Sequence, residues 1–152
     1  MNVKTTLLLL TALLLTSCGG SRKASMDEEM ALRFDKEQVW QLISMRGKAL
    51  KASDGTVTLM FYPEGKAIRG LIACNRYFAD YTLRFNEVTP EGTRYDLKMT
   101  DLSGGDVQCP EGDMALQDRY LALLGKADAC LLTPYTLTLF RGGKEVLKYE
   151  LQ

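Results

Sequence analysis

The chain has 152 residues and a mass of 17.0 kDa, enough for one domain with a single core. Apolar residues make up 46% and charged residues 25%, which excludes wholesale disorder. Lys plus Arg equals Asp plus Glu at 19 each, so we expect no nucleic-acid partner. The absence of histidine from the sequence excludes Ser-His-Asp and Cys-His catalytic sets and every His-containing metal site.

The N-terminus has the composition of a secretory signal peptide. Lys4 supplies a basic start, and Leu7–Leu15 is an apolar run interrupted only by Thr11. A transmembrane helix needs roughly 20 apolar residues, so this run is too short to span a bilayer. We expect residues 1–17 to be removed after export to an oxidising compartment.

The apolar run ends in Leu15-Thr16-Ser17-Cys18, which resembles the lipobox of bacterial lipoproteins. The resemblance implies that Cys18 becomes the first residue and carries palmitate-like acyl chains that anchor the protein to a membrane. No acidic residue follows Cys18 at once, which in such lipoproteins favours the outer membrane, and we expect the protein to face the periplasm. Residues 18–34 are then the lipidated cysteine and a flexible tether, and residues 35–152 are one folded domain.

Most of the remaining sequence alternates apolar and polar residues with a period of two, which is typical of half-buried antiparallel strands. Turn residues at 63–66 and at 142–143 each join two such segments into a hairpin. Strands are predicted at 35–45, 57–62, 67–74, 81–85, 95–99, 129–132, 136–140 and 145–151.

Helical spacing of apolar residues replaces this pattern after Pro110 and Gly112. The spacing predicts an α-helix at about 113–124, with Asp113 as its capping residue and Gly125 as its C′ residue. The expected fold is therefore mainly β. We predict a small β-barrel-like or strongly curved antiparallel sheet with this helix packed against it.

Three cysteines remain once Cys18 is assigned to lipid, so at most one intramolecular pair forms. We favour a disulfide between Cys74 and Cys109, because Cys109 lies in a loop with room to reach its partner. Cys130 is expected to pack in a strand as a small hydrophobe. Three free thiols are the alternative. No C-x-x-C motif occurs, and no histidine is available to activate a catalytic cysteine.

The segment Gly70–Tyr81, with the sequence GLIACNRYFADY, resembles the signature of the META-domain family, the HslJ-like heat-shock lipoproteins. The similarity extends over residues 38–151. Ala73 and Ala79 replace glycines that are usual in that family, and Gln117 replaces a usual glutamate. The resemblance implies a compact β-barrel-like domain with a helix after the second cysteine, and an association with envelope stress.

Candidate binding residues lie in the same segment: Asn75, Arg76, Tyr77 and Tyr81. Tyrosines at a barrel mouth suit an apolar ligand, and the asparagine amide suits a polar one. The structural alternatives are an asparagine that hydrogen-bonds its own backbone in a turn, and tyrosines that form core and cross-strand contacts.

Three functional hypotheses follow. The first is a monomeric, non-catalytic envelope lipoprotein, attached to the membrane through its lipid, that binds an unknown protein or small molecule during stress. The second is a carrier that holds a small apolar ligand inside the barrel. The third is an enzyme using a cysteine or carboxylates, for which the sequence offers no activating group. We predict no catalytic residue, no metal ligand and no cofactor.

Overall fold

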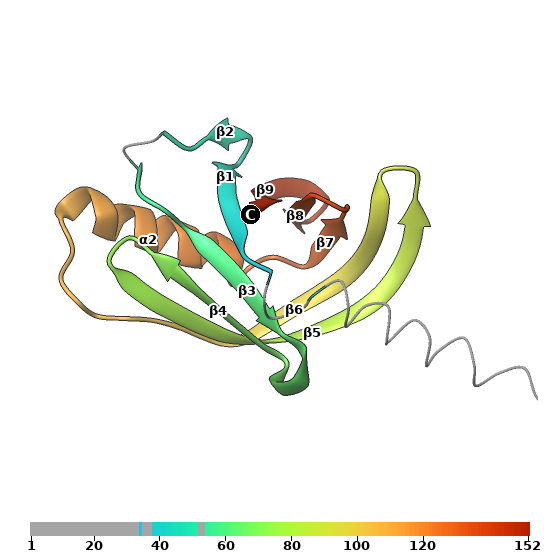
Figure 1. Cartoon of the computed structure of the whole chain (residues 1–152), viewed down its shortest axis with the longest axis horizontal. Coiled ribbons are helices and arrows are strands. Elements are labelled where there is room, and N and C mark those ends of the chain that lie inside the picture. The colour runs from blue at the N-terminus through green and yellow to red at the C-terminus, as the bar shows by residue number, and fades with distance from the viewer. Residues whose placement is uncertain (1–33, 35–37, 52–53) are drawn as a thin grey trace, which may run out of the picture. The chain divides into compact units, whose positions relative to one another are not determined.

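The computed structural model describes residues 34, 38–51 and 54–152 (Figure 1). The predicted signal peptide and the lipid site at Cys18 lie outside the described residues. Phe34 belongs to the predicted tether, but its side chain is only 1% exposed and it is part of the unit Phe34–Gln152. The folded unit therefore includes a residue that we had placed in the tether.

The strands form one antiparallel sheet in the order β2-β1-β3-β4-β5-β6-β7-β8-β9. Because β1 also pairs with β9, all of these strands except the short β2 close into an eight-stranded barrel. This confirms the predicted mainly β, barrel-like fold. The strands are β1 (Trp40–Met45), β2 (Lys48–Ala49), β3 (Thr58–Tyr62), β4 (Ala67–Ile72), β5 (Asn75–Thr89), β6 (Gly92–Gly104), β7 (Ala129–Leu132), β8 (Thr136–Arg141) and β9 (Lys144–Leu151).

The period of two in the sequence places one face of each strand inside the barrel. On β4, for example, Ile68 and Ile72 are fully buried while Arg69 and Leu71 are exposed. The interior is filled by large side chains. Among the largest of those with less than 2% exposure are Phe34, Trp40, Leu59, Phe61, Ile68, Ile72, Tyr77, Tyr120, Leu124, Leu132, Leu137 and Tyr149.

The β5–β6 hairpin is much longer than the two predicted strands, 81–85 and 95–99, and extends past its neighbours in Figure 1. Many of the extra pairs join an apolar residue to a polar or small one, such as Phe78 with Ser103 and Val88 with Thr93. Their mixed composition hides these parts of the strands in the sequence. Register shifts interrupt the β1–β9, β5–β6 and β8–β9 pairs, and Asp101 beside one shift has a φ of 52°. Such bulges increase the local twist and help a sheet close into a barrel.

The described residues form one α-helix, α2 (Glu111–Leu124), and a 3-10 turn at Pro63–Gly65. The helix begins two residues earlier than predicted, directly after Pro110, and Asp113 makes no side-chain capping bond. The predicted role of Asp113 is therefore wrong, although its charge in the first turn still suits the helix dipole.

Gly125 was predicted as the C′ residue but is the C-cap residue, and its φ of −67° is helical rather than left-handed. A Cβ at this position would lie 3.0 Å from Cδ2 of Leu102. The close approach of the helix end to β6, rather than an unusual backbone conformation, accounts for the glycine.

The two ends of the barrel are closed by different elements. Helix α2 covers one end and lies beside the β4–β5 turn (Figure 1). Its buried residues are Leu116, Gln117, Tyr120, Leu123 and Leu124. Phe34 lies deep in the barrel, with its ring centroid 4.5 Å from that of Phe61 and 5.8 Å from that of Tyr95. Since Phe61 pairs with Ile68 near the start of β4, Phe34 fills the end away from the β4–β5 turn.

Candidate functional site

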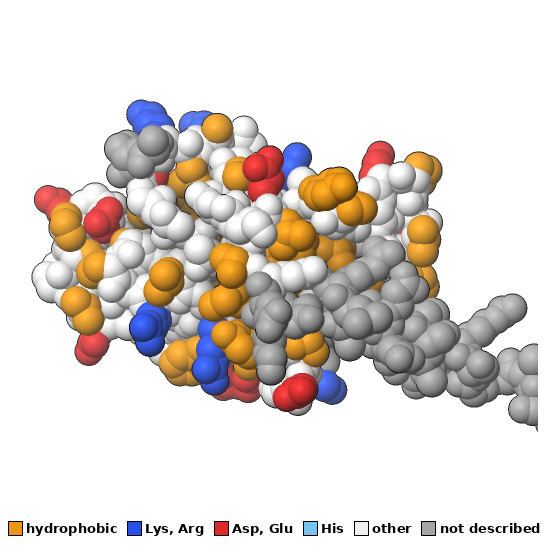
Figure 2. Space-filling view, in the orientation of Figure 1, with side chains coloured by type: hydrophobic (Ala, Val, Ile, Leu, Met, Phe, Trp, Pro, Cys, Tyr) orange, Lys and Arg blue, Asp and Glu red, His pale blue; other side chains and the backbone are white. Residues whose placement is uncertain are grey.

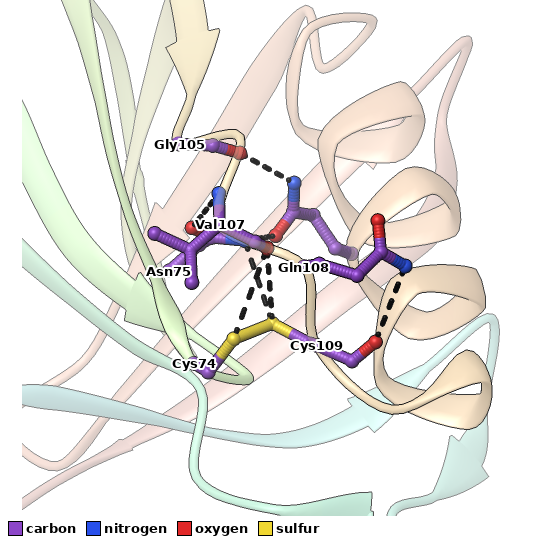
Figure 3. The surroundings of a disulfide bond; sticks show 7 residues. Cys74, Asn75, Gly105, Val107, Gln108 and Cys109 are labelled. Atoms are coloured by element: carbon purple, nitrogen blue, oxygen red, sulfur yellow. Dashed lines mark hydrogen bonds between the residues drawn. A yellow bond between two sulfur atoms is a disulfide. The ribbon is translucent and has the colours of Figure 1, made fainter.

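The β4–β5 turn carries the predicted disulfide. Cys74 in this turn is bonded to Cys109, just before α2, and their Cα atoms are 5.9 Å apart (Figure 3). The pairing predicted from the sequence is confirmed. Cys130 is buried with a free thiol, and burial raises the pKa of that thiol to about 12. At neutral pH it is therefore a protonated core side chain rather than a nucleophile.

Ala73 precedes the disulfide in this turn and has a φ of 54°. Ile72 pairs with Asn75, so Ala73 and Cys74 form a two-residue hairpin loop. A positive φ suits glycine and strains residues with a Cβ. The sequence resemblance places a glycine at this position, and the turn explains why.

Asn75 is buried at 2% exposure and makes long-range hydrogen bonds. Its Nδ2 donates to the Val107 carbonyl and to Oε1 of Gln117, both at 2.9 Å, and its Oδ1 accepts from the Val107 backbone N–H at 3.1 Å (Figure 3). Nε2 of Gln117 donates to the Gly105 carbonyl at 3.1 Å. The two amides therefore fasten the segment before α2 to both the barrel and the helix.

A chain of three phenols crosses the interior of the barrel under α2. The Tyr77 hydroxyl donates to the Thr58 carbonyl at 2.7 Å and lies 2.6 Å from the Tyr120 hydroxyl. The Tyr120 hydroxyl lies 3.0 Å from that of Tyr149. Because each phenol has one proton, Tyr149 donates to Tyr120 and Tyr120 donates to Tyr77.

The phenol chain stays neutral at ordinary pH. Burial and the neighbouring phenols raise the pKa values of Tyr77 and Tyr120 well above the ordinary value of 10.0, and burial also raises that of Tyr149. Gly70 opposite Tyr77 makes room for this arrangement, since a Cβ there would lie 2.6 Å from the Tyr77 hydroxyl. These tyrosines hold α2 on the barrel and offer no acid or base near neutral pH.

The candidate binding residues do not form one surface site. Asn75 and Tyr77 lie in the buried networks just described. Tyr81 is also buried, with its ring centroid 5.1 Å from that of Phe61, and burial raises its pKa to about 12. Arg76 alone is exposed, opposite Leu71 on β4. The structural alternatives describe Asn75, Tyr77 and Tyr81 better than ligand contact does, although Asn75 bonds distant residues rather than its own backbone.

The exposed side of strands β3, β4 and β5 carries Arg76 together with large apolar side chains. Phe78 is 54% exposed and Leu71 46% exposed. The guanidinium of Arg69 lies 5.1 Å from the ring centroid of Tyr62. We define the outer β3–β5 face by the outward-facing residues Met60, Tyr62, Arg69, Leu71, Arg76 and Phe78. The signal was present in the sequence, because Leu71 and Phe78 occupy the polar positions of their alternating strands.

The acidic residues of the described chain offer no metal centre. No three Asp, Glu or Cys side chains gather there in a way that would hold an ion. Asp96 accepts hydrogen bonds from Arg84 at 2.6 Å and from Asn86 at 2.9 Å, and these bonds lower its pKa.

Comparisons with known proteins agree with this architecture. The structure is similar to an NMR structure of a protein from Burkholderia xenovorans, with a TM-score of 0.58 and 17% identity, covering 82% of this chain and 87% of that one. A second NMR structure gives a TM-score of 0.50 and 21% identity, covering 76% and 89% of the two chains. No curated protein matches the sequence.

Across its described residues, the structure contains no helix long and apolar enough to cross a membrane. The META domain model matches residues 32–152, a range that includes every described residue. This match bears out the resemblance seen in the Gly70–Tyr81 segment, and the chain belongs to the META domain family.

Proposed function

We propose that this protein is a lipid-anchored, non-catalytic module of the bacterial outer membrane that supports envelope stress tolerance by binding a partner at its outer surface. The packed interior of the barrel carries this proposal. Large side chains fill it, and the hydroxyls of Tyr77, Tyr120 and Tyr149 hydrogen-bond to one another across it. An interior filled in this way counts against the carrier hypothesis, since a carrier needs an open, apolar cavity.

The reactive groups of the barrel support a non-catalytic role. Cys74 and Cys109 are joined, and burial keeps the Cys130 thiol protonated. The exposed carboxylate of Asp96 is held by Arg84 and Asn86. None of these groups combines exposure with an activating neighbour, which nucleophilic or acid–base catalysis requires.

Complementation of a deletion strain under heat or detergent stress tests the proposal. Wild-type protein is expected to restore survival and to fractionate with outer membranes, with acyl chains on the Cys18 peptide in mass spectra. Cys18→Ser should abolish both, because the acceptor thiol is lost. Ser17→Ala is the matched control, since a small residue still precedes the cysteine.

Two results would contradict the proposal. One is an unmodified Cys18 peptide from wild-type protein that fractionates as soluble material. The other is full survival with Cys18→Ser, which would separate the stress role from the anchor.

A further inference from the structure

We propose that the outer β3–β5 face docks on the anionic lipid headgroups of the membrane that holds the protein. The inference rests on the proposed function, because acylation of Cys18 would keep the domain beside a bilayer. It goes further by assigning a lipid surface as the ligand of named side chains.

The face pairs apolar and cationic side chains across neighbouring strands. Arg69 on β4 is opposite Phe78 on β5, and Leu71 is opposite Arg76. Directly opposed side chains on one sheet face lie about 5 Å apart. In Figure 2, hydrophobic side chains and Lys or Arg side chains are interleaved over β4 and β5. Aromatic and apolar side chains favour the boundary between the headgroups and the acyl chains of a bilayer. A guanidinium group can donate two parallel hydrogen bonds to the oxygens of one phosphate.

The charges of the face favour an anionic surface. Neither Arg69 nor Arg76 forms an ion pair among the described residues, in contrast to Arg84, which is bonded to Asp96. Asp80 is the next outward position on β5 after Phe78, opposite Ala67. The six residues of the face itself include two arginines and no carboxylate, so the face is positively charged. A basic side chain near an anionic membrane surface strengthens binding roughly fivefold.

The point where the chain enters the barrel brings this face within reach of the anchoring membrane. Phe34 packs against Phe61 on β3, one of the strands of the face. Fifteen residues, Gly19–Arg33, separate it from Cys18. A chain of fifteen residues spans at most about 50 Å when fully extended. Tethering at this distance makes even weak docking effective, because the local concentration of headgroups is high.

Fluorescence quenching by lipid tests the inference on the full acylated protein. Trp40 is the single native tryptophan and is 1% exposed, so a Phe78→Trp variant adds a reporter on the face. Tyr135→Trp is the matched control, because Tyr135 is 76% exposed between β7 and β8. Both variants are reconstituted into vesicles of phosphatidylethanolamine and phosphatidylglycerol that contain brominated lipid.

The expected result is a shift of the Phe78→Trp emission to shorter wavelength and quenching by at least about twofold, with little change for Tyr135→Trp. Charge reversal by Arg69→Glu and Arg76→Glu in the Phe78→Trp background should remove the quenching. The matched reversal, Arg141→Glu with Lys144→Glu in the β8–β9 hairpin, should leave it intact. Circular dichroism checks that every variant is folded.

Equal quenching of the two reporters, in protein that floats with the vesicles, would contradict docking by the outer β3–β5 face. It would still be consistent with the lipid anchor at Cys18. Unchanged quenching in vesicles of neutral phosphatidylcholine would overturn the assignment of anionic headgroups. A Phe78→Trp reporter that stays unquenched in the brominated vesicles, together with crosslinking of this face to a protein in cell envelopes, would assign the face to a protein partner instead. Protein that lacks acyl chains and does not float would overturn the proposed function, and this inference with it.

Discussion

The two ends of the barrel differ in the chemistry that closes them. At the α2 end, the Cys74–Cys109 disulfide and the amides of Asn75 and Gln117 fasten the helix and the segment before it. At the other end, Phe34 closes the barrel by packing its ring among aromatic neighbours. A hydrogen bond or a disulfide forms only between particular side chains. Packing of a ring in a core requires mainly an apolar side chain of the right volume. The α2 end is therefore specified by particular residues and the Phe34 end by burial.

Phe34→Ala should have the largest effect, because it removes the ring that fills one end of the core. We expect the free energy of unfolding to fall by about 4 kcal/mol, as for other buried phenylalanines. Urea denaturation measures the change. Phe78→Ala is the control, since its ring is 54% exposed, and should change stability by less than about 0.5 kcal/mol. A small loss of unfolding free energy for Phe34→Ala would mean that this end of the barrel closes without the Phe34 ring.

Loss of the disulfide should have the second largest effect on the free energy of unfolding. The two cysteines are separated by 35 positions, and the chain-entropy model assigns a loop of that size about 3–4 kcal/mol. Cys74→Ala with Cys109→Ala should lower the unfolding free energy by this amount, measured by urea denaturation. Dithiothreitol should destabilise wild-type protein equally and leave the double variant unchanged. Equal stability of the reduced and oxidised wild type would contradict the importance given to this end.

Gln117→Glu tests the amide network. At pH 7 a carboxylate cannot donate to the Gly105 carbonyl, so we expect a loss of about 2 kcal/mol. Burial raises the pKa of such a carboxyl, and its protonated form can donate again. The folded state then binds more protons than the unfolded state, so the deficit should shrink as pH falls towards 4.

Gln117→Met, which cannot titrate, is the matched control and should show a pH-independent deficit. A deficit of Gln117→Glu that does not change with pH would contradict the assigned hydrogen bonds.

Ala73→Gly should have the smallest effect and the opposite sign. Relief of the positive φ should stabilise the protein by about 0.4–1 kcal/mol, measured by thermal unfolding. Ala79→Gly is the control, because Ala79 also replaces a glycine usual in the family but has no positive φ. It should destabilise the protein instead, since glycine weakens a strand interior. Stabilisation by both variants would show that the turn strain is not the cause.

The sequence predicted the parts of the fold that repeat a pattern. Alternation identified strands such as Thr136–Arg141, and Gly142–Gly143 marked the hairpin that follows it. Counting the cysteines available in an oxidising compartment left at most one pair, and the loop position of Cys109 favoured its pairing with Cys74. The helix was identified from its spacing, with its start misplaced because Pro110 itself precedes the first turn.

The contacts that build the candidate site could not be predicted in the same way. Asn75 and Gln117 are 42 positions apart, and no local pattern links two amides at that distance. Phe34 stands alone before the first strand, without a period that would mark it as core. The outer β3–β5 face was missed because Leu71 was counted as an ordinary member of the strand predicted at 67–74. Phe78 lay between that strand and the one predicted at 81–85.

Native mass spectrometry of the protein extracted gently from cell envelopes tests most directly the claim that the barrel interior is a packed core and that function lies on the surface. We predict one mass: the chain from Cys18 with its acyl groups and one disulfide, and no further small molecule. An additional apolar molecule that stays bound in the native spectrum and is lost on denaturation would contradict this account and restore the carrier hypothesis.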